Sequence, residues 1–144
     1  MKKDGRNIPL DIIERGLRDG DCDVRAAAMK ACDGRDIPPS RTFEPQKYVY
    51  KKCANNVIVV AEIPDDAHIR GKIGKKCRAS KAKIVNIIGD VFGEKVGISL
   101  YNTDVWYFIG DVIEIPDFDL SDNECSTGFH FFCAEEEARN YNFE

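Results

Sequence analysis

Residues 48–63 read YVYKKCANNVIVVAEI, and this stretch decides the fold. Tyr48–Lys52 and Val57–Ile63 are rich in β-branched and aromatic residues, which are typical of strands. Asn55 and Asn56 lie between the two runs, and asparagine is common in tight turns. The stretch therefore predicts a β-hairpin.

Downstream of this hairpin the sequence remains strand-rich. Residues 65–81 show no clear period, so we expect a loop with a short helical turn there. Beyond them, turn residues separate short apolar runs. These runs predict strands at Lys83–Ile88, Lys95–Leu100, Val105–Ile109, Val112–Ile115 and Phe129–Phe132, followed by a helix at Ala134–Tyr141. The body is therefore expected to be α+β with a mostly antiparallel sheet. For the aromatic run Val105–Ile109 core packing is the default, and base stacking in a pocket is the alternative.

Upstream, two helical patterns precede a break at residues 38–40. The first begins at Pro9, which suits a first helical turn, and the second is introduced by Asp21 or Asp23, either of which is a good N-cap. The second pattern stops at Gly34. Their apolar faces comprise Leu10, Ile13 and Leu17 in the first pattern, and Val24, Ala27, Ala28 and Ala31 in the second.

This helical pair resembles a HEAT-like repeat. Residues 8–17 are followed by Asp23-Val24-Arg25, which opens the second helix in such repeats, and GRNIP at 5–9 recurs as GRDIP at 34–38. One unit cannot bury its own faces, so it must pack on the rest of the chain or on another protomer, which hints at a homo-oligomer. We expect a HEAT-like helical hairpin at 1–39 and an α+β ligand-binding domain at 43–144.

Composition excludes several classes of protein. The chain has 144 residues (16.2 kDa), of which 43% are hydrophobic and 32% charged, as in a globular domain. Its longest apolar run, Val57–Ala61, is strand-sized, so we expect no membrane association. The first residues show no secretory signal, and we therefore expect a cytoplasmic protein, in the host cytoplasm if a phage encodes it.

Charge is divided unevenly along the chain. Residues 1–83 hold 19 basic and 12 acidic side chains, whereas residues 84–144 hold 2 basic and 13 acidic ones. This split predicts an electrostatic interface, either between the halves of one chain or between copies; the alternative is that the basic side chains are simply solvated. The isoelectric point near 5.3 argues against nucleic acid as a partner.

The cysteines and histidines do not form a recognisable metal site. The six cysteines include no Cys-x-x-Cys pair, and the two histidines do not complete a zinc pattern. We expect no metal and no cofactor, with most of the cysteines acting as small buried hydrophobic residues.

The densest basic cluster covers residues 70–83, with seven basic residues, two glycines and no acids. Lysine and arginine neutralise phosphate charge, and glycine lets the backbone approach an anion. A small phosphate-bearing molecule is the favoured ligand; a loop that is solvated or paired with the acidic half, and nucleic acid, are the alternatives. The candidate ligand-binding residues here are Arg70, Lys75, Lys76, Arg78 and Lys81.

A second candidate group lies around His130. Strand alternation places His130 on the opposite face from Phe129 and Phe131, where it could face a pocket with Ser126 or Thr127. The alternatives are a partly buried histidine without a ligand, and a Cys–His nucleophile pair with Cys125 or Cys133.

The same region carries two family resemblances. Gly128–Phe132 with Ala138 and Tyr141 resembles a signature of a phage and large-virus domain of unknown function, which often follows pentapeptide or HEAT-like repeats. The resemblance spans 47–141 and includes Tyr50–Cys53, Val59–Pro64, Lys76–Lys83 and Tyr107–Asp111.

The strand and helix are also similar to an element of ADP-ribosyltransferases. That similarity implies a nucleotide pocket bordered by Tyr50 and Lys51, with Thr127 and His130 across from them. His130 occupies the position of the family's tyrosine, and no glutamate has a recognisable catalytic context. We therefore expect a non-catalytic phage or prophage protein that binds a small nucleotide-derived anion, as a sponge for a host immune signal. An ADP-ribosyltransferase-like or nucleotide-processing enzyme and a protein–protein adaptor are the alternatives.

Overall fold

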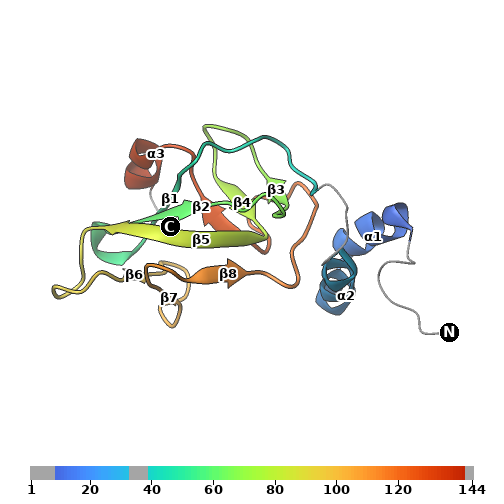
Figure 1. Cartoon of the computed structure of the whole chain (residues 1–144), viewed down its shortest axis with the longest axis horizontal. Helices are drawn as coiled ribbons and strands as arrows, with labels where there is room; N and C mark the ends of the chain where they lie inside the picture. The colour runs from blue at the N-terminus through green and yellow to red at the C-terminus, as the bar shows by residue number, and fades with distance from the viewer. Residues whose placement is uncertain (1–8, 33–38, 142–144) are drawn as a thin grey trace.

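The computed structural model describes residues 9–32 and 39–141. Within these ranges the protein is α+β, with two N-terminal helices, antiparallel sheets and a C-terminal helix, as predicted. Figure 1 shows α1 (Leu10–Leu17) and α2 (Cys22–Cys32) at one end of the molecule, and α3 (Glu135–Asn140) at the other. The repeated pentapeptide at 34–38 lies outside the described residues, and so does its first copy at 5–9 except for Pro9.

The larger sheet has four antiparallel strands in the order β1-β2-β5-β8. β1 and β2 form the predicted hairpin around a 3₁₀ helix (η2, Ala54–Asn56). Asn55 and Asn56 adopt positive φ angles of 64° and 59°, which asparagine tolerates better than most residues. The prediction of a turn at this pair is confirmed. The four strands are Val49–Lys52 (β1), Ile58–Glu62 (β2), Lys81–Ile88 (β5) and Val112–Glu114 (β8).

A second antiparallel sheet joins the first along β1. Its order is β3-β4-β9, and Tyr50 and Phe132 exchange backbone hydrogen bonds of 2.8 and 2.7 Å across the junction. This seam between β1 and β9 brings together segments about 80 residues apart, and it positions the candidate site. The strands are Ile69–Arg70 (β3), Cys77–Ala79 (β4) and Phe129–Phe131 (β9); β6 (Gly97–Ile98) and β7 (Trp106–Tyr107) form a separate pair.

Two sequence predictions are wrong here. Residues 65–81 were expected to form a loop, but they contain β3 and β4, which at two and three residues are too short to show alternation. In the run Val105–Ile109 only Tyr107 is buried, so core packing fails for the other four residues. Only Trp106 and Tyr107 of this run pair with β6, and Phe108 and Ile109 lie in the turn that follows.

The helical pair packs on the rest of the chain, which was one of the two expected alternatives. Ile13 and Leu17 of α1 and Ala28 of α2 form a small core with Phe118 and Leu120, from the loop that precedes β9. Leu120 N also donates to Leu17 O at 3.0 Å. The loop therefore packs against both helices and holds them on the sheet domain.

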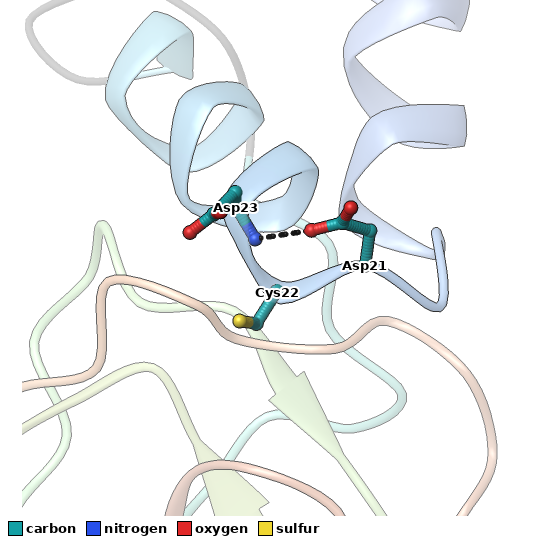
Figure 2. Close-up of side chains that lie close together, drawn as sticks. All are labelled: Asp21, Cys22 and Asp23. Carbon is teal, nitrogen blue, oxygen red and sulfur yellow. Dashed lines mark hydrogen bonds between the residues drawn. The ribbon is translucent and has the colours of Figure 1, made fainter.

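Helix α2 begins with a capping hydrogen bond, which Figure 2 shows: Asp23 N donates to Asp21 Oδ1 at 2.8 Å. This bond satisfies one of the unpaired donors of the first turn, as predicted from the sequence. The predicted apolar face is wrong in part, because Val24 and Ala27 are exposed while Arg25 is buried. Arg25 faces inward because its guanidinium donates to the carbonyls of Asp19 and Asp117.

In the described ranges 9–32 and 39–141, no helix has both the length and the apolar character needed to cross a membrane.

A methyl group at Gly97 would enter the core directly. A Cβ built there would overlap Val59 Cγ2 and lie 3.2 Å from Cys53 Sγ. We expect Gly97→Ala to lower the free energy of unfolding by about 1–3 kcal/mol, the usual cost of overpacking. Urea unfolding measures this change. Gly20→Ala is the control, because no described atom lies within 4 Å of its Cβ; an equal loss in both variants would contradict the prediction.

Candidate functional site

A small pocket opens at the seam between β1 and β9. It has about 350 Å³ of space, including the open solvent at its mouth. Because that figure counts open solvent, the pocket is a partly open depression and not an enclosed cavity. Among the described residues no carboxylate lines it, whereas three lysines do. The lining residues are Lys51, Lys52, Lys76, Leu100, Tyr101, His130, Phe132 and Tyr141.

Lys51 is the innermost of the three cations. Its Nζ donates to His130 O at 3.2 Å and lies 5.4 Å from the centre of the Phe129 ring. Burial away from water lowers the pKa of the Lys51 amine to about 8; the negative charge of an ionised Cys53 opposes this shift, and the positive charge of Lys76 adds to it. No ion pair joins Lys51 to a carboxylate within the described part of the chain.

Lys76 lies between two tyrosines at the edge of the pocket. Its Nζ is 5.6 Å from the ring centre of Tyr101 and 5.9 Å from that of Tyr141, distances at which cation–π attraction acts. Phe132 packs against Tyr141 with their ring centres 5.3 Å apart. The pocket therefore combines positive charge with aromatic faces, which suits a ligand that has both an anionic group and a ring.

His130 is held in one orientation by the backbone. Its Nε2 lies 2.7 Å from Ser126 O, and because a carbonyl only accepts, Nε2 carries the proton and Nδ1 is left as an acceptor. Burial lowers the pKa of His130 to about 4; the bond to Ser126 opposes this shift, while Lys51 and Lys76 add to it. The ring is therefore neutral at physiological pH.

Lys52 lines the pocket, but its ammonium group donates to backbone carbonyls and so stabilises the fold. Its Nζ donates to Arg139 O at 3.0 Å and to Tyr141 O at 2.9 Å, which are carbonyls at the end of α3. A cation at this end of a helix satisfies unpaired carbonyls and complements the helix dipole. Lys52 thus fixes Tyr141, and with it one wall of the pocket.

The two predicted arginines lie outside the pocket. Arg78 is 1% exposed, and its guanidinium donates to the backbone carbonyls of the loop that precedes β9. Arg70 is also buried, and it donates to Leu120 O at 2.7 Å and to Ser40 Oγ at 2.9 Å. Their donors are therefore committed to the fold. The carbonyls that Arg78 binds are those of Asp119, Ser121, Asn123 and Thr127.

The remaining predicted residues also fall outside the lining. Lys81 forms ion pairs with Asp66 and Glu114 at 2.8 and 3.9 Å, and Thr127 Oγ1 donates to a backbone carbonyl. Lys75 is exposed on the turn before β4. Tyr50 joins the seam through its backbone. Of the nine predicted residues, the pocket therefore brings together Lys51, Lys76 and His130.

Sequence reasoning did not propose the other lining residues as ligand contacts. Tyr141 and Phe132 occur in the signature that ends the chain, so a signal for them existed. Tyr101 follows a short strand in a stretch without a motif, and no local pattern points to it. Lys52 adjoins Lys51, but strand alternation would place it on the other face.

Two further groups carry no chemistry that we assign. Burial raises the pKa of the Cys77 thiol to about 12 and also raises that of Cys133, so a Cys133–His130 nucleophile pair is not favoured. The donor atoms of Asp21, Cys22 and Asp23 lie within 4.8 Å of one another, and all three residues are exposed (Figure 2). Capping of α2 accounts for this group, and we assign no metal to it.

The comparisons with known proteins identify one family. The sequence model of DUF5758, described as a family of unknown function, matches residues 36–138. The match begins next to the predicted boundary at residues 38–40 and covers the sheet domain. No curated protein and no solved structure matches the chain.

Proposed function

Because the chain belongs to DUF5758, a family of unknown function, we propose its function from the pocket: it binds a small anionic, nucleotide-derived ligand without converting it. One observation carries the proposal. Lys51 and Lys76 line a small pocket that has no carboxylate among its described lining residues. Buried or half-buried cations are normally paired, so an anionic ligand is the natural partner for these two.

The aromatic walls support a ligand with a ring. Tyr101 and Tyr141 flank Lys76, so a phosphate could meet the ammonium while a base stacks on a tyrosine. His130 would accept a hydrogen bond through Nδ1, because Nε2–H already donates to Ser126. In this proposal Tyr101 and Tyr141 border the base in place of Tyr50, which does not line the pocket.

Binding without turnover would make the protein a sponge. A phage or prophage accessory protein of this kind, in the cytoplasm of its host, would sequester an immune signalling nucleotide. The lack of a carboxylate in the described pocket lining supports binding over an ADP-ribosyltransferase-like reaction.

We also propose that α1 and α2 form a HEAT-like unit. The two helices pack closely, since a Cβ at Gly16 would lie 2.8 Å from Ala28 Cβ, and this close packing supports the proposal.

Adjacent lysines provide a matched pair of variants. We expect Lys76→Glu to weaken the binding of nucleotide phosphates at least about tenfold, because it places a negative charge at the anion site. Lys75→Glu makes the same charge change one residue away, outside the pocket, and should change affinity less than about threefold. Calorimetric titration with AMP, ADP, ADP-ribose and a cyclic dinucleotide measures both, with adenosine as the uncharged control.

Native mass spectrometry of the protein purified from cells complements the titrations, since a retained nucleotide would appear as added mass. The proposal fails if no compound in the panel binds with a dissociation constant below about 1 mM, or if Lys75→Glu weakens binding as much as Lys76→Glu does.

Other outcomes would favour the alternative functions. Turnover of labelled NAD would favour an enzyme. An oligomer with nothing bound would favour the adaptor, and its candidate surface is the exposed group Val105, Trp106, Phe108 and Ile109.

A further inference from the structure

The amine of Lys51 is in an unusual position for a lysine. Its Nζ lines the pocket, lies near the Phe129 ring and, within residues 9–32 and 39–141, makes one hydrogen bond, to the carbonyl of His130. Most lysines extend into water or pair with a carboxylate. Here the pocket lining offers a second lysine in place of a carboxylate, so the ammonium form of Lys51 is disfavoured.

This environment makes the neutral amine available at ordinary pH. With a pKa of about 8, roughly a quarter of Lys51 is neutral at pH 7.5, against about one in a thousand for an unperturbed lysine. A desolvated lysine beside a second cation is the usual arrangement of amine nucleophiles that form Schiff bases. The backbone carbonyl of His130 orients the amine while leaving it in the pocket.

Lys76 adds selectivity for a particular class of carbonyl compound. Its ammonium lies at the edge of the same pocket, between the rings of Tyr101 and Tyr141. A phosphate bound there would place the rest of a small ligand toward Lys51. We propose that Lys51 forms a reversible imine with a phosphorylated aldehyde, such as the open-chain form of a phosphorylated sugar.

The reaction needs no oxidant or reductant. The lone pair of the neutral Nζ attacks the carbonyl carbon, the C–N bond forms, and the π electrons move to the carbonyl oxygen. Both amine hydrogens then leave with that oxygen as water, which gives the C=N bond. This inference rests on the proposed anion site, and it narrows the nucleotide-derived ligand to one with a free aldehyde.

Reductive trapping tests the inference on the full chain. The probe is pyridoxal 5′-phosphate, which has an aldehyde, a phosphate and a ring; it is added at one equivalent, reduced with borohydride, and the label is mapped by tandem mass spectrometry. We expect at least about tenfold more label on Lys51 than on any exposed lysine, with a pH midpoint near 8. Lys51→Arg should lose this label while keeping its circular dichroism spectrum.

The control probe is 5′-deoxypyridoxal, which lacks the phosphate and, unlike pyridoxal, has no 5′-hydroxyl that can close onto the aldehyde. We expect Lys76→Ala to reduce labelling of Lys51 by pyridoxal 5′-phosphate several-fold. The same variant should reduce labelling by 5′-deoxypyridoxal much less, only as far as loss of the Lys76 charge raises the pKa of Lys51. Lys75→Ala should leave labelling by both probes close to wild type. Label spread evenly over the exposed lysines would overturn the inference, even if nucleotides bind in the titrations. If both probes label Lys51 equally, the proposed selectivity for a phosphate is contradicted. If, in addition, no nucleotide binds in the calorimetric titrations, the proposed function is contradicted as well.

Discussion

Arg78→Met is expected to lower the free energy of unfolding by about 3–5 kcal/mol, a large part of the 5–15 kcal/mol typical of a domain. The guanidinium is buried and donates to four backbone carbonyls of the loop before β9. Methionine keeps the apolar stem but has no donor, so these acceptors lose their partner. Thermal unfolding should show a midpoint lower by at least about 10 °C.

The same substitution should also disturb the pocket. The loop that Arg78 holds includes Ser126, whose carbonyl orients His130. Arg18→Met is the matched control, because Arg18 is exposed, and we expect its midpoint within about 2 °C of wild type. A midpoint equally close to wild type for Arg78→Met would show that the loop holds its conformation without the guanidinium.

Acid is expected to destabilise the protein between pH 6.5 and pH 4. Burial lowers the pKa of both histidines, His68 and His130, to about 4. In the unfolded chain they bind protons below about 6.5, whereas the folded protein keeps both rings neutral until about pH 4. The unfolded state therefore gains protons first, and stability that is complete above pH 6.5 is lost as the pH falls through this window.

The expected size of this effect is about 5 kcal/mol between pH 7.5 and pH 4.5, since each shift of one pKa unit corresponds to about 1.4 kcal/mol. Urea unfolding at the two pH values measures it. These are the only two histidines in the sequence, and Asp66 and Asp119, whose pKa values are lowered from 3.8, act at lower pH.

Direct NMR titration of the two imidazole rings provides the control, because it needs no variant. Values near 6.5 for both rings would contradict the prediction. His130→Gln should then remove about half of the loss in this window, because His68 still titrates. A stability profile that is flat from pH 7.5 to pH 4.5 in the wild-type protein would also refute it.

Local patterns were sufficient for most of the secondary structure. The hairpin around Asn55 and Asn56, the start of α2 at Asp21 and the strand that carries His130 all lie where the sequence places them. Each depends on residues a few positions apart, such as a cap and the turn it satisfies. β3 and β4 could not be predicted in this way, since strands of two or three residues exist only through their partners.

The residues of the candidate site were likewise predictable only in part from local sequence patterns. The sequence identified a basic segment, a histidine and the charge imbalance, but it did not distinguish Lys76 in the pocket from Lys75 in solvent. It also assigned Arg70 and Arg78 to a ligand, whereas both donate to backbone carbonyls 40 to 50 residues away. Charge alone does not indicate whether a cation meets a ligand or a carbonyl.

By itself, the sequence determined an α+β chain with an N-terminal helical pair, a β-hairpin and a chemistry of lysines, tyrosines and histidine. The tertiary structure decided which of these side chains meet. Lys51 and His130 become neighbours only because β1 and β9 join at the seam, and Tyr101 and Tyr141 reach Lys76 from segments on either side of β9. The physical reason is range: caps and turns act within a few residues, whereas a pocket depends on pairings between strands distant in the chain.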